Sequence, residues 1–433
     1  MKTVWLSFAF LLLFISQSFS QFTLKGEFRP RFEYRGGYGK ILSKDVNPQF
    51  TVSMRTRLSA YYQIDKFTFG LSIQDVRAWG DDNAAFYSAN AGSSASIDLN
   101  EGWIGMKIYQ NGLIKIGRQL WAYEDERIFS LRNWNQSQVK YDALLFQHAG
   151  KKIQFDMGLS WNNELDNFLY DQGYPSNRFK TINFLYLKKK LNDWLYLSGM
   201  AIASGVTKAD TSNIIYLQGT YGLYLGINKG NLKALASGYY QNGRNRKGLN
   251  TSAYMFSAKV DYLIADKFTI GAGIDYLSGK DQQNDDPEYS SMNHTFDIFY
   301  GNRHSYYGHL DYFSNLPTST DNGGLADIFL KFNYAIKPNL SAGVDLHYFR
   351  LQNNVQDPTI EITEMLDKGL GEEIDVFFSW DIVKYVNVRG GYSCFLATES
   401  MEKLQGVYDQ ARFPSWVWVM ITAKPVFWDT AAK

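Results

Sequence analysis

The stretch FTLKGEFRPRFEYR, residues 22–35, decides the fold of this 433-residue chain. Its alternate positions form two faces of opposite character. One face carries Phe22, Leu24, Gly26, Phe28, Pro30, Phe32 and Tyr34, and the other carries Thr23, Lys25, Glu27, Arg29, Arg31, Glu33 and Arg35. A helix would scatter these charges around its circumference, whereas a strand separates them completely. The stretch is therefore predicted to be a β-strand with one apolar and one charged face.

The same alternation recurs along the chain, and the connections between the alternating stretches differ in length. Further strands are predicted at 50–64, 153–161, 217–227, 268–276, 326–336, 340–348, 374–382 and 386–396. Short turns are predicted at 65–66, 111–112, 150–152, 192–193, 228–230, 265–267, 337–339 and 383–385. Long polar segments lie at 36–48, 80–96, 121–138, 163–178, 205–213, 279–293, 352–371 and 398–413. Short turns on one rim and long loops on the other are typical of outer-membrane barrels.

The composition favours a barrel in lipid over a soluble β-protein. Aromatic residues make up 16% of the chain, yet the mean hydropathy is −0.30. A lipid-facing wall around a polar interior reconciles these two values. Soluble sandwiches have shorter strands and similar loops at both ends, and no fixed repeat indicates a propeller. We predict an all-β transmembrane antiparallel β-barrel of about 18 strands, with short periplasmic turns and long extracellular loops.

The strand number stays open between 16 and 20, and one stretch is uncertain because a further hairpin there would make twenty. Residues 294–325 either add a hairpin or fold inward as a plug.

The start of the chain predicts export. Lys2 precedes an apolar run at 4–15, and small residues at Ser18 and Ser20 suit cleavage before Gln21. Residues 1–20 are therefore expected to be a signal peptide and residues 21–433 the barrel domain, located in the outer membrane of a Gram-negative bacterium. The single cysteine excludes an internal disulfide, and a net charge of +1 gives no argument for nucleic-acid binding.

The charged faces are expected to line the barrel interior. They carry a cluster of four arginines near the N-terminus, Arg29, Arg31, Arg55 and Arg57, while the last third is acidic at positions such as Asp345, Glu373, Asp375 and Asp381. Closure of the barrel brings the first and last strands together. One interpretation is that the basic and acidic walls pair across this seam. The other is that unpaired arginines bind carboxylates or phosphates, which suit the planar guanidinium.

Two segments resemble the alginate-export family of outer-membrane barrels. The first, GRQLWAYEDERIFSLRNWNQSQVKYD at 117–142, is similar through Gly117, Arg118, Gln119, Asp125, Arg127, Ile128, Trp134, Tyr141 and Asp142. The second, FDIFYGNRHSYYGHLDYF at 296–313, is similar through His304, Gly308 and Asp311. The resemblance implies an eighteen-stranded barrel with an arginine-rich constriction that passes polyuronate. It also implies lumen roles for Arg118, Asp125, Arg127, Asp142, His304 and Asp311.

The leading functional prediction is a passive channel for anionic sugars or polysaccharides, with outer-membrane lipid around it and periplasmic export or uptake partners. The predicted solute pathway consists of Arg29, Arg31, Arg55, Arg57, Arg118, Asp125, Arg127, Asp142, His304 and Asp311. No catalytic residue, metal ligand or cofactor is predicted, because the five histidines lack metal-ligand spacing and no nucleophile motif accompanies them.

Three alternatives stay open. The first is a general non-selective porin. The second is an outer-membrane hydrolase with a rim site at His304, His309 and Asp311, although a structural His309–Asp311 pair on one strand face is the simpler interpretation. The third is a closed structural or adhesive barrel with a fully paired interior.

Overall fold

The structure of the protein is a computed structural model that describes residues 20–80, 96–162, 179–208, 214–360 and 364–430. The predicted signal peptide lies outside the described residues except for Ser20. From Gln21 to Asp429 the described chain forms a single antiparallel sheet.

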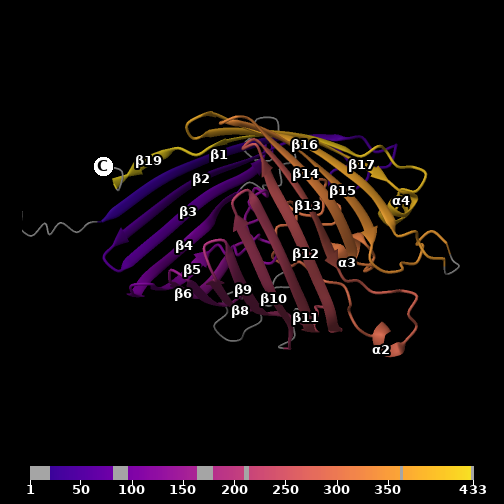
Figure 1. Cartoon of the computed structure of the whole chain (residues 1–433), viewed down its shortest axis with the longest axis horizontal. Helices are drawn as coiled ribbons and strands as arrows, with labels where there is room; N and C mark the ends of the chain where they lie inside the picture. The colour runs from indigo at the N-terminus through magenta and orange to yellow at the C-terminus, as the bar shows by residue number, and fades with distance from the viewer. Residues whose placement is uncertain (1–19, 81–95, 163–178, 209–213, 361–363, 431–433) are drawn as a thin grey trace, which may run out of the picture.

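The strands follow one another around the wall in chain order (Figure 1). They are β1 (Gln21–Gly36), β2 (Gln49–Ile64), β3 (Phe67–Ala78), β4 (Ser96–Tyr109), β5 (Gly112–Gln119), β6 (Tyr141–Ala149), β7 (Ile153–Trp161), β8 (Thr181–Lys190), β9 (Leu195–Thr207), β10 (Ile215–Lys229), β11 (Leu232–Arg244), β12 (Asn250–Ile264), β13 (Phe268–Leu277), β14 (Leu325–Lys337), β15 (Leu340–Leu351), β16 (Gly369–Val383), β17 (Val386–Ala397), β18 (Ser415–Ala423) and β19 (Val426–Asp429).

The barrel closes because β1 pairs with β2 on one side and with both β18 and β19 on the other. The strands β18 and β19 together occupy a single strand position of the barrel. They are interrupted at Pro425, which has no N–H to donate to a neighbouring strand. The carbonyl of Pro425 still accepts a hydrogen bond of 2.9 Å from the Gly26 N–H. In the described part of the chain the barrel therefore has 18 strands, as predicted.

The two rims differ as the sequence predicts. Turns of two to four residues join β2 to β3, β4 to β5 and the corresponding later pairs, whereas the opposite rim carries the long loops. In the described parts of these loops lie three short helices, α2 (Pro287–Ser290), α3 (Leu316–Ser319) and α4 (Glu399–Gln405). By the arrangement of outer-membrane barrels, the short-turn rim is periplasmic and the long-loop rim extracellular.

The described helices are all too short and too polar to cross a membrane.

The outer face of the wall is apolar. Exposed side chains include Leu58 on β2, Leu71 on β3, Leu223 on β10 and Val376 on β16. Exposed aromatic residues gather at the short-turn rim, where Tyr109, Trp194, Tyr262 and Tyr385 lie in or within three residues of a turn. An apolar band edged by aromatic residues is the surface that a bilayer solvates. Fold and exterior together place the barrel in the outer membrane.

Two long loops fold into the barrel. We call residues 120–140 the plug loop and residues 278–324 the inner loop. Phe129 of the plug loop and Phe296, Leu310 and Phe313 of the inner loop are fully buried. The segment 294–325 therefore folds inward as a plug and does not add a hairpin.

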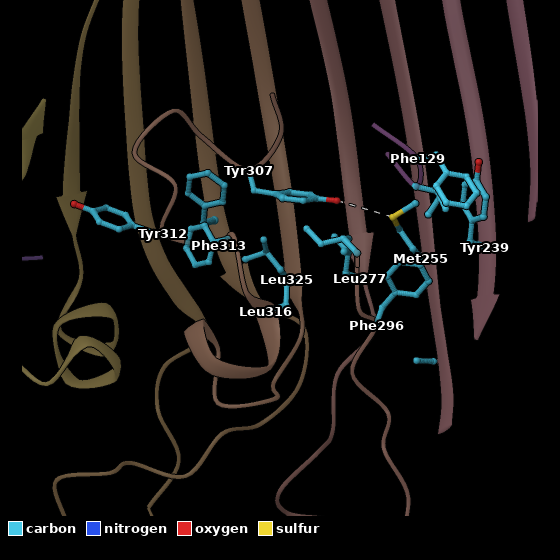
Figure 2. Close-up of a cluster of buried hydrophobic side chains, with 14 of the residues drawn as sticks. Phe129, Tyr239, Met255, Leu277, Phe296, Tyr307, Tyr312, Phe313, Leu316 and Leu325 are labelled. Atoms are coloured by element: carbon cyan, nitrogen blue, oxygen red, sulfur yellow. Dashed lines mark hydrogen bonds between the residues drawn. The ribbon is translucent and has the colours of Figure 1, made fainter. Parts of the chain in front are cut away.

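A hydrophobic core consequently lies inside the barrel (Figure 2). Tyr307, Phe313 and Leu316 of the inner loop pack toward wall residues such as Leu325 and Met255. Burial of each large apolar side chain stabilises this arrangement by roughly 1.5–3 kcal/mol. The interior is thus partly a packed core, and the two loops cover part of the charged faces that were expected to line it.

Candidate functional site

The arginine cluster lies on the inner face of β1 and β2. The register places Arg29 directly opposite Arg55, and Glu27 opposite Arg57. Like charges directly opposite on neighbouring strands repel. Arg29, Arg31 and Arg55 are nevertheless almost completely buried, so other groups must compensate their charge.

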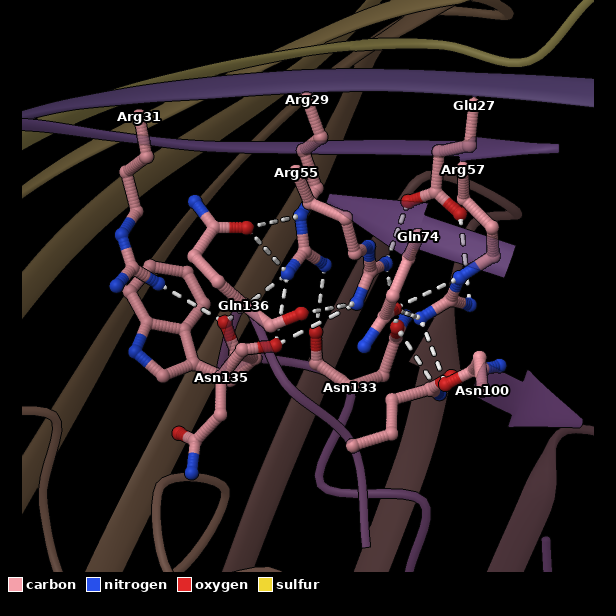
Figure 3. A network of polar contacts seen from close by, with 12 residues as sticks. Glu27, Arg29, Arg31, Arg55, Arg57, Gln74, Asn100, Asn133, Asn135 and Gln136 are labelled. Atoms are coloured by element: carbon pink, nitrogen blue, oxygen red, sulfur yellow. Dashed lines mark hydrogen bonds and ion pairs between the residues drawn. The ribbon is translucent and has the colours of Figure 1, made fainter. Parts of the chain in front are cut away.

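The plug loop supplies that compensation through main-chain oxygens (Figure 3). Arg29 donates to the carbonyls of Asn133 at 2.5 Å and Asn135 at 2.8 Å. The side chain of Gln136 accepts two further bonds from Arg29, from Nε at 3.1 Å and from Nη2 at 2.9 Å. Arg55 donates to the Gln136 carbonyl at 3.2 Å. The loop therefore covers the cluster with a row of oxygens.

The other arginines of the first strands have partners on the wall. Arg31 forms an ion pair of 2.9 Å with Glu33 and also donates to the Trp134 carbonyl at 2.9 Å. The Arg57 guanidinium donates to the side chain of Gln74 from Nε, at 3.1 Å. Glu27 pairs with Arg55 and lies 3.9 Å from Arg57.

One of the two interpretations was that the basic and acidic walls pair across the seam, and this pairing is not formed among the described residues. The carboxylates paired with these arginines, Glu27 and Glu33, both lie on β1. On the acidic wall, Asp345 instead pairs with Lys331 at 2.6 Å. Trp416 of β18 lies at the seam and donates to Glu33 at 3.2 Å.

Arg127 forms a second buried centre, between the plug loop and the wall. Its guanidinium pairs with Asp125 at 3.0 Å and with Asp275 of β13 at 2.8 Å, and it stacks on Tyr306 of the inner loop at 3.9 Å. Burial lowers the pKa of Arg127, but the surrounding acidic groups outweigh this effect and hold the pKa well above its usual value. Asp125 and Arg127 thus join the two loops to the wall and do not face open solvent.

His304 and Asp311 come together within the inner loop. Nδ1 of His304 lies 2.9 Å from Asp311, which also accepts a hydrogen bond from Tyr38. The predicted His309–Asp311 pair on a strand face is wrong, because the segment is a loop and His309 lies 3.6 Å from Asp375 instead. Burial lowers the pKa of His309 to about 4, so its imidazole is neutral at pH 7.

Arg118 and Asp142 lie apart from both centres. Neighbouring strands β5 and β6 place them opposite each other, and they form a bidentate ion pair of 2.8 and 2.7 Å near the long-loop rim. Both side chains remain substantially exposed to solvent, so this pair contributes little to stability.

Two cavities approach the arginine cluster from opposite rims. The vestibule cavity has a volume of about 1210 Å³ and opens toward the long loops; its charged lining residues are Arg118, Arg132, Lys140, Arg246, Lys247, Lys280, Arg303, Asp98, Asp142 and Asp297. The periplasmic cavity has a volume of about 590 Å³ beside the turn between β16 and β17; its charged lining residues are Arg29, Lys384, Arg389, Lys424 and Asp381. Basic residues outnumber acidic ones in both cavities.

Several of these residues were missed by the sequence reasoning. Arg132 lies four to seven residues from Asp125 and Ile128 in the same polar segment, yet its role depends on the carbonyls of Phe299 and Gly301, which it contacts across the interior. Arg303 sits beside His304, but nothing in the local pattern shows that it reaches the vestibule cavity. Within the described residues, no cluster of His, Cys, Asp and Glu side chains could hold a metal ion.

Comparison with solved structures shows the same fold. The chain is similar to Pseudomonas aeruginosa OccK9 (OpdG), with a TM-score of 0.61 and 11% identity over 94% of this chain and 98% of that one. It is also similar to Acinetobacter baumannii OccAB1, with a TM-score of 0.62 and 12% identity over 94% and 97%. The outer membrane protein opdK from Pseudomonas aeruginosa gives a TM-score of 0.60 and 10% identity over 94% and 99%.

No protein family and no curated protein sequence matches the chain significantly. The resemblance to the alginate-export family is therefore not confirmed. At these identities the structural likeness shows the fold alone, that of an outer-membrane β-barrel.

Proposed function

We propose that this protein is a passive outer-membrane channel for anionic solutes, with sugar acids or polyuronate as the class of cargo. The observation that carries the proposal is the excess of basic side chains in both cavities: seven basic against three acidic residues line the vestibule cavity, and four against one line the periplasmic cavity. A positive potential at both mouths concentrates anions and lowers their barrier to entry.

The arginine cluster gives the pathway a binding step between these mouths. Guanidinium groups bind carboxylates through two parallel hydrogen bonds. Arg29 both belongs to the cluster and lines the periplasmic cavity, so an anion in that cavity lies within reach of it. Nearby carboxylates such as Glu27 and Glu33 keep the field moderate, which allows release as well as binding.

The solved structures that resemble this chain support a channel function but not a particular cargo. The opdK protein named above is described as an outer membrane protein, and barrels of this size enclose a path for solutes. Nothing in the comparisons bears on an anionic cargo, so the choice of cargo rests on the basic lining.

One alternative has an observation in its favour. Arg29 and Arg55 are only 2% and 0% exposed, which fits a closed barrel with a structural interior. The hydrolase alternative is less well supported, because the ring of His304 is stacked on Trp134 and its Nδ1 is engaged by Asp311.

Liposome swelling tests the proposal. Proteoliposomes carrying the protein should admit glucuronate faster than glucose, by about threefold or more, and the variant Arg389→Gln should reduce this preference. Arg389 lines the periplasmic cavity, and glutamine removes its charge while keeping most of its bulk. The matched control is Arg244→Gln at the end of β11, a position that lines neither cavity. Equal entry of both sugars would contradict an anionic cargo, and entry of neither would favour the closed barrel.

A further inference from the structure

The segment Asn133 to Gln136 of the plug loop separates the two cavities. Arg132, immediately before it, lines the vestibule cavity, and Asn133, its first residue, lines the periplasmic cavity. Among the described residues, none lines both cavities. Ser137, immediately after the segment, also lines the vestibule cavity, so the segment lies between the two cavities.

Hydrogen bonds to the arginine cluster hold the segment in place, and its acceptors are uncharged. Arg29, Arg31 and Arg55 donate to carbonyl oxygens of all four residues of the segment, and Arg29 also donates twice to the Gln136 side chain (Figure 3). Each is a bond between a cation and a neutral oxygen. Such bonds are weaker than those between a guanidinium and a carboxylate.

Arg29 is the residue at which this difference matters most. It is almost fully buried, yet in the described part of the chain no carboxylate lies within ion-pair distance of it, whereas Arg31 and Arg55 have Glu33 and Glu27. A buried guanidinium without a counter-ion is electrostatically costly. A carboxylate that reached Arg29 would supply the missing charge.

The backbone of the plug loop is strained next to the segment. Arg132 has a φ of +44°, and Glu124 and Glu126 have φ values of +52° and +65°. Residues other than glycine rarely adopt this left-handed conformation, and holding them there costs of order 1 kcal/mol each. Of these three residues, Arg132 adjoins the segment, so a shift of the segment would allow Arg132 to leave the left-handed conformation.

We propose that residues 133–136 are a plug that anionic solutes displace: its main-chain oxygens occupy the guanidinium groups of Arg29, Arg31 and Arg55 until the carboxylate of a solute replaces them, beginning at Arg29. This inference rests on the proposed function and adds to it the way in which the solute itself opens the channel. A neutral sugar has no charge to offer the arginines, and chloride cannot form the two parallel hydrogen bonds of a carboxylate. Both leave the plug in place, so binding and opening are one event for carboxylates alone.

Single-channel recording in planar bilayers tests the plug, with chloride as the main current carrier and glucuronate or glucose added as probes. In the native protein, glucuronate should raise the fraction of time in the open state about fivefold, and glucose should not. The variant Gln136→Ala loses three side-chain hydrogen bonds to the wall, two from Arg29 and one to Ser53. It should be open more often without any probe. The matched control is Asn183→Ala, because the Asn183 side chain on β8 donates to Thr181 of the same strand and, in the described part of the chain, forms no hydrogen bond with the plug loop.

A cross-link keeps the test independent of any effect of Gln136→Ala on folding. The side chains of Ser53 and Gln136 are 3.0 Å apart, so the pair Ser53→Cys and Gln136→Cys, made with Cys394→Ser to remove the native thiol, can be joined by a short bismaleimide. The joined channel should no longer respond to glucuronate, and the unjoined cysteine pair should respond.

The outcomes separate the plug from the proposed function. Anion preference with equal open fractions in native protein and Gln136→Ala, and with no response to glucuronate, would overturn the plug while leaving the anion channel intact. A response that survives the cross-link would also overturn it. Absence of any anion preference in every variant would overturn the proposed function and the plug together.

Discussion

The indole of Trp134 lies parallel to the imidazole of His304, with ring centroids 4.0 Å apart and an interplanar angle of 15°. Trp134 belongs to the plug loop and His304 to the inner loop, so this stack is a direct contact between the two segments that fill the barrel. Trp134 also forms a cation–π contact with Arg31, whose guanidinium carbon lies 4.2 Å from the centre of the indole ring. One side chain thus connects the arginine cluster of the wall with both loops.

Truncation of Trp134 should loosen the interior. Trp134→Ala removes the stack on His304 and the cation–π contact with Arg31 and leaves a cavity, at a total cost of about 3–5 kcal/mol. We expect a higher ion conductance in planar bilayers and an unchanged barrel. Trp161→Ala is the control, because Trp161 lies exposed at the end of β7. Equal conductance of the two variants would show that Trp134 does not hold the interior closed.

The buried pair of Arg127 and Asp275 should anchor the plug loop. Asp275→Asn leaves the guanidinium buried with Asp125 as its remaining carboxylate, and loss of one partner from a buried pair costs about 3–5 kcal/mol. Hydrogen exchange of peptides covering the plug loop should become at least about a hundredfold faster. Asp261→Asn on β12 is the matched control: its pair with Lys259 is partly exposed, and such pairs contribute at most about 1 kcal/mol. If both variants exchange at the native rate, Arg127 is not an anchor.

Acid should weaken the packing of the inner loop through His309. Burial lowers the pKa of this imidazole to about 4, below the value of about 6.5 in an unfolded chain, so the folded state favours the neutral form. The resulting stability is complete above about pH 6.5 and is lost as the pH falls from 6.5 to 4, by about 3 kcal/mol at most. Urea unfolding midpoints between pH 4 and 7.5 measure this, and His309→Gln should flatten the profile in that window. A profile that keeps its slope in the variant would assign the acid sensitivity to other groups.

Alanine substitutions at two glycines of the long loops should distinguish the effect of steric overlap from the effect of backbone strain. Gly308 has a φ of +84°, and a Cβ there would overlap the carboxylate of Glu373. Gly39 has a similar φ of +75° but nothing lies within 4 Å of its Cβ position. Gly39→Ala should therefore cost only about 1 kcal/mol of strain, whereas Gly308→Ala should also displace the inner loop from the wall. Protease cleavage within residues 278–324 should increase for Gly308→Ala alone; similar cleavage in both variants would mean that the close approach to Glu373 is not required.

The wall of the barrel could be predicted from the sequence because lipid and the barrel interior impose opposite demands on alternate residues. Residues 22–35 show this most clearly, since every charged side chain in them falls on one face. The turns were predictable for the same local reason. The interruption of the last strand at Pro425 was not expected, although proline at that position explains it.

The filling of the barrel could not be predicted, because its contacts join residues far apart in the chain. Asp125 and Arg127 were singled out through the family resemblance, but their wall partner Asp275 is about 150 residues away and belongs to an ordinary alternating strand. The arginines of β1 and β2 were placed correctly on the inner face. Their partners are carbonyl oxygens of the plug loop, and main-chain groups leave no trace in the residue pattern.

The permeability ratio of chloride to potassium in a reconstituted bilayer tests the central claim most directly. The measurement uses a salt gradient across the membrane at low total ionic strength. The basic lining of both cavities predicts a zero-current potential with the sign of an anion-selective channel, and Arg389→Gln should shift this potential toward zero. A zero-current potential on the cation-selective side, unchanged in that variant, would contradict an interior built to pass anions.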